Sequence, residues 1–507
     1  MEVAIVTSEA VPFSKTGGLA DVTGTLFKEY LDMGIEAFLF VPLYKRTAEQ
    51  FREEIQDTGI TIDIPLGRAM RRCRVFILKS QRTEYRRQNT DKKNLTSDFW
   101  LLASERVFFI GNDEYFGRDE FYGTPSSDYP DNDQRFTFFC KSVLETCKKL
   151  NMNIDIMHCH DWQTGFIPLY LKTLYKGNSV FKKTKSILTI HNLGYQGWFP
   201  QQTMEITGFG WELFNPEGIE FYGQVNFLKA GIIGADIITT VSKTYAKEIL
   251  MPEYGFGLDG ILRKRADSIM GILNGLDYSE WDPSTDKFLP RTYNKSRISD
   301  VLAGKLECKR ELMKRCSLKG GTDMPLLCFI GRLCGQKGID ILVDAIPEII
   351  ERGANIVIIG KGEEVYYSRI ESASKHFGGR IFFHAGFDEA LAHLSYAGSD
   401  IFLMPSRYEP CGLGQMIAMH YGTIPVASKT GGPSDTIEDG KTGFLFEKYS
   451  KDAFLKGINR AVGVFSVKDC WQRIIKNAMG KDFSLERSAR LYLKVYSGDY
   501  KGLWEKI

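Results

Sequence analysis

Asp400–Tyr421, DIFLMPSRYEPCGLGQMIAMHY, contains a complete crossover from a strand to a helix. The apolar run 401–404 predicts a buried parallel strand, which Pro405 ends. After Gly412 the apolar residues recur at three- and four-residue steps, which indicates a helix. Glu409 therefore follows the carboxyl end of a strand, where open α/β sheets bind ligands and where a helix N-terminus attracts anions. Taken alone, the stretch is more typical of a surface loop with a solvated glutamate and a glycine that starts a helix.

The same alternation of strand and helix occurs through both halves of the chain. The first half opens with a strand at Val3–Thr7, a helix at Leu19–Asp32 and a strand at Ile35–Val41. The second half has predicted elements at Leu326–Ile330, Ile339–Glu351, Asn355–Ile359, Ile381–Ala385 and Thr423–Ala427. This pattern predicts an α/β fold with two Rossmann-like domains that face a cleft.

The domain boundary is expected near Ser268–Asp277, where a short strand runs into a turn. We therefore predict an N-terminal domain over 1–270 and a C-terminal domain over 271–480. An amphipathic pattern over Ser484–Tyr496 predicts a last helix within 481–507.

Composition excludes several classes of protein. The chain has 507 residues and a formal net charge of +2, so bulk electrostatics favour neither nucleic acid nor an anionic membrane. No apolar run reaches the roughly 18 residues that a bilayer span needs, and MEVAIVTSEA has no basic segment typical of a signal peptide. The ten cysteines include no C-x-x-C pair, which favours reduced thiols in a cytosol over disulfides or a zinc site. Nothing in the composition indicates an oligomeric state.

Two loops carry cations beside glycines. Lys15-Thr16-Gly17-Gly18 fits no nucleotide fingerprint, but adjacent glycines let backbone N–H groups approach an anion and Lys15 adds a charge. A tight solvated loop remains an equal alternative there. Arg332 and Lys337 share one strand-to-helix loop and suit a diphosphate. Their position beyond a strand favours the phosphate over two solvated surface cations.

Histidines and acidic residues suggest further candidates. Strand alternation puts His158 and His160 on one face, but no further ligands for a metal follow at useful spacing. We expect His158 to pack in the core and His160, nearer the strand end, to face the cleft. Asp131-Asn132-Asp133, in the predicted loop 122–136, resembles a D-x-D metal motif. We favour polar residues that contact sugar hydroxyls or cap the following helix. The polar segment 81–93 predicts an exposed, mobile excursion.

Seven short motifs now make the chain recognisable. They are KTGGL at 15–19, HDW at 160–162, HNLGYQG at 191–197, LNGLD at 273–277, RL with QKG within 332–338, RYEPCGL at 407–413 and TGG at 430–432. In this order the chain resembles the bacterial and plant glycogen/starch synthase family over nearly its whole length.

The resemblance implies a GT-B architecture whose last helix crosses back to the first domain. It implies a hexosyltransferase, cytoplasmic or in a plastid stroma, that transfers glucose from ADP-glucose to the non-reducing end of an α-1,4-glucan. The configuration is retained, and neither metal nor another cofactor is implied. The N-terminal domain would serve the glucan acceptor and the C-terminal domain the nucleotide-sugar donor. A UDP-glucose-using synthase, another retaining glycosyltransferase and an inactive glucan-binding protein remain as alternatives.

Residue roles follow from the same resemblance. The implied catalytic residues are Glu409, His160, Arg332 and Lys337. The implied donor-binding residues are Lys15, Gly17, Gly18, Asn274, Arg332, Lys337, Cys411, Gly412, Leu413, Thr430 and Gly431. The implied acceptor or sugar-binding residues are Asp21, Asp131, Asn132, Tyr195 and Gln196.

The chain departs from related transferases at two positions. Ile417 stands where many have a second glutamate, so recognition of the ribose by that carboxylate is lost, and Ala20 replaces a frequent glycine. A double displacement needs a nucleophilic carboxylate beneath the anomeric carbon, and the motifs offer no second one. We therefore favour substitution on one face of the sugar, with the leaving phosphate as base.

Overall fold

The chain folds into two compact units. A computed structural model describes residues 1–79, 102–124 and 127–499. Unit 1 comprises residues 1–241, 246–272 and the end of the chain from Ala489, and unit 2 comprises 242–245 and 273–488. The main chain therefore crosses from one unit to the other after Ile272, within the segment 268–277 where the sequence predicts the boundary.

Unit 1 is built on a nine-stranded sheet with the order β12-β11-β7-β6-β1-β2-β5-β4-β3. From β12 to β5 all neighbouring strands pair in parallel, whereas β4 pairs antiparallel with both β5 and β3. From β1 the chain passes to β2 and then to β3 at the edge of the sheet, returns through β4 to β5 beside β2, and then crosses to β6 on the other side of β1. The strand order thus reverses between β1 and β6, which is the topological switch point of the sheet. The bounds of the strands are β1 Glu2–Val6, β2 Glu36–Pro42, β3 Ile55–Leu66, β4 Ala69–Leu78, β5 Val107–Gly111, β6 Ile156–His160, β7 Lys185–Ile190, β11 Ile237–Thr240 and β12 Ile269–Gly271.

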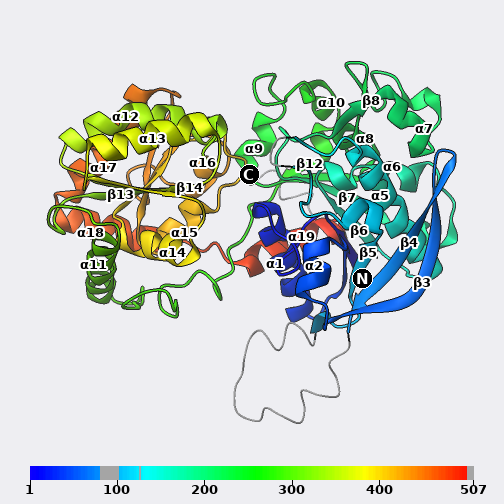
Figure 1. The fold of residues 1–507 in the computed structure, drawn as a ribbon, viewed down its shortest axis with the longest axis horizontal. Coiled ribbons are helices and arrows are strands. Elements are labelled where there is room, and N and C mark those ends of the chain that lie inside the picture. Colours follow the sequence, from blue (N-terminus) through cyan, green and yellow to red (C-terminus); the bar gives the residue numbers. More distant parts are fainter. Residues whose placement is uncertain (80–101, 125–126, 500–507) are drawn as a thin grey trace, which may run out of the picture. The chain divides into compact units, whose positions relative to one another are not determined.

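Helices cover this sheet, and a small second sheet, β8-β10-β9, lies beside it (Figure 1). The small strands are β8 Trp198–Pro200, β9 Glu220–Phe221 and β10 Gln224–Asn226. The helices are α1 Gly18–Asp32, α2 Lys45–Gln50, α4 Asp113–Phe116, α5 Asn132–Lys149, α6 Phe166–Lys172, α7 Met204–Thr207, α8 Phe227–Gly234 and α10 Asp259–Lys264. Helix α9, Lys243–Glu248, begins among the residues of unit 2 and ends in unit 1.

The last helix, α19 (Leu485–Ser497), returns to unit 1. Its Tyr492, Val495 and Tyr496 are buried in the same apolar core as residues of β1, β2 and α1. The Tyr30 hydroxyl donates to the Tyr496 hydroxyl over 2.8 Å, and the Tyr496 hydroxyl lies 2.7 Å from Nδ1 of His158. The expected return of this helix to the first domain is confirmed.

Unit 2 has a six-stranded parallel sheet with the order β15-β14-β13-β16-β17-β18. Its switch point lies between β13 and β16. Figure 1 shows α12 and α13 on one face of this sheet and α14 and α15 on the other. The strands are β13 Leu326–Ile330, β14 Asn355–Gly360, β15 Ile381–Ala385, β16 Ile401–Met404, β17 Ile424–Ser428 and β18 Phe444–Phe446. The helices are α11 Ile298–Arg315, α12 Ile339–Glu351, α13 Glu364–His376, α14 Glu389–Gly398, α15 Gly414–His420, α16 Gly431–Thr436, α17 Lys451–Phe465 and α18 Lys468–Met479.

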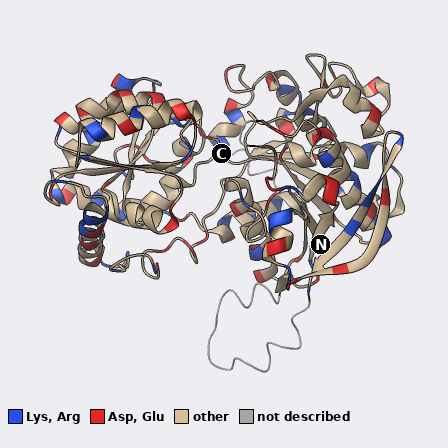
Figure 2. Cartoon of the chain, in the orientation of Figure 1, with Lys and Arg blue, Asp and Glu red and all other residues tan. Residues whose placement is uncertain are grey.

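Surface properties agree with the composition. Lys and Arg are interspersed with Asp and Glu along the elements of each unit (Figure 2). All ten cysteines are free thiols. In the part of the chain that the structure describes, no helix has the length and apolarity needed to cross a membrane.

Two expectations about residues 50–136 need comment. The sequence pattern did not predict strand β3. The loop predicted over 122–136 extends too far, because helix α5 already begins at Asn132. The excursion expected over 81–93 lies outside the described residues.

Candidate active site

Two loops meet at the switch point of unit 2. Strands β13 and β16 are hydrogen-bonded neighbours, so the loops that follow them leave the same edge of the sheet side by side. The backbone N–H of Arg407 donates to the carbonyl of Gln336 over 2.9 Å. Gly338 has a φ of +72°, and a Cβ there would lie 1.8 Å from the Pro405 carbonyl oxygen. Only glycine therefore allows the two loops to approach this closely.

The closest side-chain contact between these loops joins Lys337 to Glu409. The ammonium nitrogen of Lys337 lies 2.6 Å from Oε2 of Glu409, and the two side chains are 20% and 6% exposed. The Ser406 hydroxyl donates to the same carboxylate oxygen over 2.9 Å. Two donors from different loops thus fix a carboxylate at the carboxyl end of the sheet. The sequence predicted both residues here but not their ion pair.

Arg332 is the second cation of the β13 loop. Its side chain is exposed, and its guanidinium lies 3.3 Å from the side-chain oxygen of Gln336. A guanidinium can bind two oxygens of a phosphate at once. With Lys337 it gives this loop two positive charges, one of which pairs with Glu409.

A third loop, after β17, packs against the backbone of residues 409–411. The N–H of Gly432 donates to the Glu409 carbonyl over 3.0 Å. A Cβ on Gly431 would lie 2.0 Å from the Glu409 carbonyl oxygen, and one on Gly432 would lie 1.6 Å from that of Cys411. Both glycines are therefore required by the chain's own packing. Thr430, which precedes them, is buried.

Asn274, near the start of unit 2, contacts the loop that follows β16. Its backbone N–H hydrogen-bonds the Cys411 sulfur, and burial raises the pKa of that thiol to about 12, so the thiol stays protonated. The Oδ1 atom of Asn274 is buried and accepts no hydrogen bond from any described residue. A buried acceptor left unpaired marks a place where a ligand can donate. Leu413 is half-buried, and Gly412 has a φ of +70°.

The switch point of unit 1 brings together the loop after β1 and the end of β6. In the first loop, Lys15 forms an ion pair with Asp21 over 2.6 Å. Burial raises the pKa of Asp21, although Lys15 opposes the shift. A Cβ on Gly17 or Gly18 would meet nothing within 4 Å. Packing within the described residues therefore does not require these glycines, and the space beside their backbone suits a ligand.

Of the two histidines at the end of β6, His158 packs in the core, as the sequence predicted. His158 is fully buried, lies 2.6 Å from the Thr189 hydroxyl and contacts Tyr496, and burial lowers its pKa to about 3. Nδ1 of His160 lies 3.0 Å from Nε2 of His191. Burial, helped by the two neighbouring imidazoles, lowers the pKa of His160 well below its usual value. Nε2 of His160 is buried without a hydrogen-bond partner in the described ranges. A neutral imidazole with one unused nitrogen can bind a hydroxyl.

Asp161 connects these histidines to the next loop. It accepts the backbone N–H of His191 over 2.7 Å, and burial raises its pKa to about 7. Its φ of +56° is rare for a residue with a side chain, and such strain is concentrated at functional sites.

Glu9 is a buried carboxylate that sequence reasoning missed. It accepts the hydroxyls of Thr16 over 2.7 Å and of Tyr122 over 2.5 Å, and also the backbone N–H groups of Thr16 and Gly17. These bonds fix the glycine loop that follows β1. The signal was present in the sequence, because Glu9 follows a buried strand much as Glu409 does.

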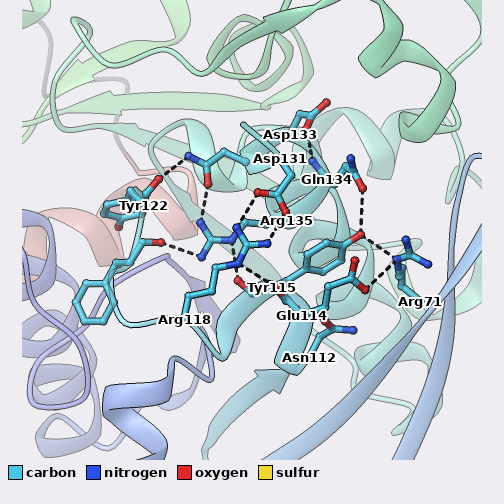
Figure 3. Close-up of polar contacts among 12 residues, drawn as sticks. Arg71, Asn112, Glu114, Tyr115, Arg118, Tyr122, Asp131, Asp133, Gln134 and Arg135 are labelled. Atoms are coloured by element: carbon cyan, nitrogen blue, oxygen red, sulfur yellow. Dashed lines mark hydrogen bonds and ion pairs between the residues drawn. The ribbon is translucent and has the colours of Figure 1, made fainter. Parts of the chain in front are cut away.

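Asp131 belongs to a polar network with Arg118 and Arg135 (Figure 3), and Asn132 bonds directly to Arg135. Arg135 donates to the Tyr115 carbonyl over 2.7 Å and to Oδ1 of Asn132 over 2.6 Å. Asn132 in turn donates to the Tyr122 carbonyl over 2.8 Å. Asp131 pairs with both terminal nitrogens of Arg118, at 2.8 and 2.5 Å. Asp131 occupies the N-cap position of α5, but its side chain makes no capping bond, so the capping alternative is wrong for this residue.

The two remaining predicted sugar-binding residues differ in exposure. Tyr195 is 52% exposed. Gln196 is buried, and its amide oxygen accepts from Trp198 over 2.8 Å and from Asn226 over 2.7 Å. Its amide nitrogen donates to the Phe256 carbonyl over 3.1 Å. Gln196 thus holds its loop in place through its own side chain.

Comparison with known proteins identifies the family. Residues 2–264 match the starch synthase catalytic domain, and residues 314–463 match glycosyl transferases group 1. The chain is 47% identical to a glycogen synthase from Thermodesulfovibrio yellowstonii over 502 residues, with 98% of each chain covered. A glycogen synthase from Geotalea daltonii is 41% identical with the same coverage. The chain belongs to the glycogen synthase family.

Solved structures agree with this membership. The catalytic domain of starch synthase IV from Arabidopsis thaliana, bound to ADP and acarbose, matches with a TM-score of 0.84 and 29% identity, covering 98% of this chain and 99% of that one. A sucrose-phosphate synthase from Thermosynechococcus elongatus, with a TM-score of 0.60 and 15% identity over 98% and 99% of the two chains, shares the fold. This glycogen synthase family member is therefore a hexosyltransferase, and its two parallel-sheet units are the Rossmann-like domains of a GT-B glycosyltransferase.

Proposed function

We propose that this enzyme transfers glucose from ADP-glucose to the non-reducing end of an α-1,4-glucan in the cytoplasm, with retention of configuration. The observation that carries the proposal is the Lys337–Glu409 contact at the switch point of unit 2. This contact places the ammonium group that would bind a diphosphate within hydrogen-bond distance of the carboxylate that would face the sugar carbon. Unit 2 would bind the donor and unit 1 the glucan.

The diphosphate is assigned to Arg332 and Lys337. Negative charge builds up on the leaving phosphate, and fixed cations that meet it there lower the barrier. Because Lys337 is already paired with Glu409, a bound phosphate would share its ammonium group with that carboxylate. These two cations supply the charge that a metal ion would otherwise provide, so the proposed reaction needs no metal.

Glu409 is assigned to the transferred carbon. Its carboxylate, fixed by Lys337 and Ser406, would stabilise the positive charge that develops at the anomeric carbon. Ile417, at the position of the second glutamate of many related transferases, is a buried apolar residue of α15 and offers no carboxylate. We therefore propose substitution on one face of the sugar, with the departing phosphate taking the acceptor's proton.

The remaining donor contacts are assigned to the loops of both units. The backbone of Cys411, Gly412 and Leu413 and the loop at Thr430 and Gly431 would bind glucose hydroxyls. The buried Oδ1 of Asn274 would accept a hydrogen bond from the ligand, and the buried Nε2 of His160 would bind one of its hydroxyls. Lys15 and the open backbone at Gly17 and Gly18 would approach the phosphates.

The acceptor contacts are assigned to Asp21 and Tyr195. Asp131, Asn132 and Gln196 have side-chain partners within unit 1. Their proposed role is to hold the loops of the site in shape.

Initial rates with a glycogen primer test this assignment. ADP-glucose should give primer-dependent ADP release and an α-1,4-linked product, while UDP-glucose should be used much less efficiently. Preference for UDP-glucose would replace the proposed donor but keep the reaction class. Glucose transfer to sucrose instead of glycogen would refute the glucan acceptor. Glycogen binding without turnover of either donor would favour an inactive glucan-binding protein.

A further inference from the structure

A second cluster of charged side chains lies in unit 2, and none of its members belongs to the candidate active site. Glu389 and His393 are four residues apart on α14, so both project from the same face of that helix. Glu280 comes from the segment that follows the crossover into unit 2. One carboxylate oxygen of each glutamate and one ring nitrogen of His393 all lie within 4.8 Å of one another.

The hydrogen bonds of His393 leave one ring nitrogen unused. Its Nδ1 lies 2.8 Å from Oδ2 of Asp286. Asp286 also accepts the Tyr421 hydroxyl over 2.7 Å and the Phe288 backbone N–H over 2.9 Å. Nδ1 of His393 is thus occupied by Asp286, and Nε2 is the ring nitrogen left for a ligand.

Nε2 of His393 is the nitrogen that the cluster can offer to a ligand. The imidazole is 2% exposed, and Nε2 is buried with no hydrogen-bond partner in the part of the chain that is described. A buried acceptor left unpaired costs free energy unless a ligand fills its place. A carboxylate on one ring nitrogen, with the other nitrogen facing the ligand, is the arrangement that orients histidines toward metal ions.

The imidazole is fixed, whereas the two glutamates can adjust. Trp281 stacks on the His393 ring with centroids 4.0 Å apart and planes 8° apart, so the ring cannot turn Nε2 away. Ligands around a tetrahedral Zn²⁺ stand about 3.4 Å apart, given metal–ligand bonds of about 2.0–2.1 Å. Glu280 and Glu389 are exposed, and binding an ion would draw their carboxylates inward from the present spacing of up to 4.8 Å.

We propose that Nε2 of His393 and the carboxylates of Glu280 and Glu389 bind a divalent cation of the Zn²⁺ class, with water as the fourth ligand. Two carboxylates neutralise the charge of the ion, and an imidazole ligand selects Zn²⁺ over Mg²⁺ or Ca²⁺. The cation would tie the segment that follows the crossover to α14. This site is structural and lies outside the glucosyl transfer proposed above.

Calorimetric titration of the full-length, tag-free protein with Zn²⁺ tests the site. We expect one equivalent to bind, and Glu280→Gln or Glu389→Gln each to weaken binding at least about tenfold, the scale seen when even an outer partner of a ligand is lost. The matched control is Glu371→Gln, which changes an exposed glutamate of α13 and should leave the affinity unchanged. Unchanged Zn²⁺ affinity in both cluster variants, or equal affinity for Mg²⁺, would overturn the proposal.

Trp281 reports where the ion binds. Co²⁺ at His393 should quench the emission of the stacked Trp281, which is one of seven tryptophans. Trp281→Phe should abolish this quenching while one equivalent of Co²⁺ still binds. Quenching that persists in Trp281→Phe would place the ion elsewhere, for example at the partly exposed Cys334 or Cys470, and would refute the site.

Discussion

Glu409→Gln removes one charge from the candidate active site and leaves its shape almost unchanged. In the wild type the carboxylate is 6% exposed and accepts from Lys337 over 2.6 Å and from Ser406 over 2.9 Å. A glutamine oxygen still accepts from Ser406. It no longer neutralises Lys337, and it no longer stabilises positive charge on a sugar carbon. The substitution thus separates electrostatics from packing.

The expected losses differ in size for stability and for turnover. Leaving one partner of a buried ion pair alone costs about 3–5 kcal/mol. Lys337 is 20% exposed and can reach water, which reduces the loss to about 1–3 kcal/mol. A protein that is stable by about 5–15 kcal/mol stays almost entirely folded after that loss. Losing a preorganised charge at the reacting centre costs about 2.7–4 kcal/mol in the barrier, or roughly 100- to 1,000-fold in kcat. Destabilisation therefore cannot account for the predicted drop in rate.

ADP release with saturating glycogen and ADP-glucose measures kcat, and urea unfolding of the same samples measures stability. Glu447→Gln is the matched control, because Glu447 is an exposed glutamate of unit 2 that also pairs with a lysine, Lys429, over 2.9 Å. The control should retain wild-type kcat. A Glu409→Gln enzyme that is folded and turns over within about threefold of the wild type, a barrier change below 1 kcal/mol, would remove Glu409 from the mechanism.

Two further predictions concern stability. Gly338→Ala should lower the free energy of unfolding by about 3 kcal/mol or more, because its Cβ would overlap the Pro405 carbonyl. Gly353→Ala, with a φ of +82° and open space, should cost only about 1–2 kcal/mol in urea unfolding; equal losses would refute the steric argument. His158 has a pKa of about 3 when folded and about 6.5 when unfolded, so stability should fall as the pH drops from about 6.5 toward 3. His158→Gln should flatten this dependence by up to about 1.4 kcal/mol per pH unit, whereas the exposed His376→Gln should not, and an unchanged slope in His158→Gln would contradict the assignment.

The sequence predicted best the elements with a strong local pattern. The bounds of β13, β15, β16 and α12 agree with the structure residue by residue. Strands β13 and β16 are buried and read as unbroken apolar runs, and α12 has the pattern of an amphipathic helix. β3 was missed for the opposite reason. It alternates half-buried and exposed residues, and its pattern contains Gly59 and Pro65, which weaken a strand signal. Its place in the sheet depends on pairing with β4, which the sequence does not display.

Contacts within the site also depend on which strands are neighbours in the sheet. Lys337 and Glu409 are 72 residues apart and touch because β13 and β16 are neighbours in the sheet, which no local pattern reveals. The involvement of Asp131 and Gln196 in internal bonds was hidden for the same reason. Their partners, Arg118 and Asn226, are brought to them by tertiary folding.

The two units place a carboxylate at the same point of their sheets but surround it differently. Glu9 follows β1 and Glu409 follows β16, each at a switch point. Glu9 is held by hydroxyls and backbone N–H groups, which are neutral donors, and burial raises its pKa. Glu409 is held by the ammonium group of Lys337. A carboxylate with neutral donors serves to order a loop, whereas one paired with a cation brings opposite charges to one point, as a reaction that separates charge between a phosphate and a sugar carbon requires. The partners of each carboxylate, more than its position, therefore distinguish the catalytic candidate from the structural one.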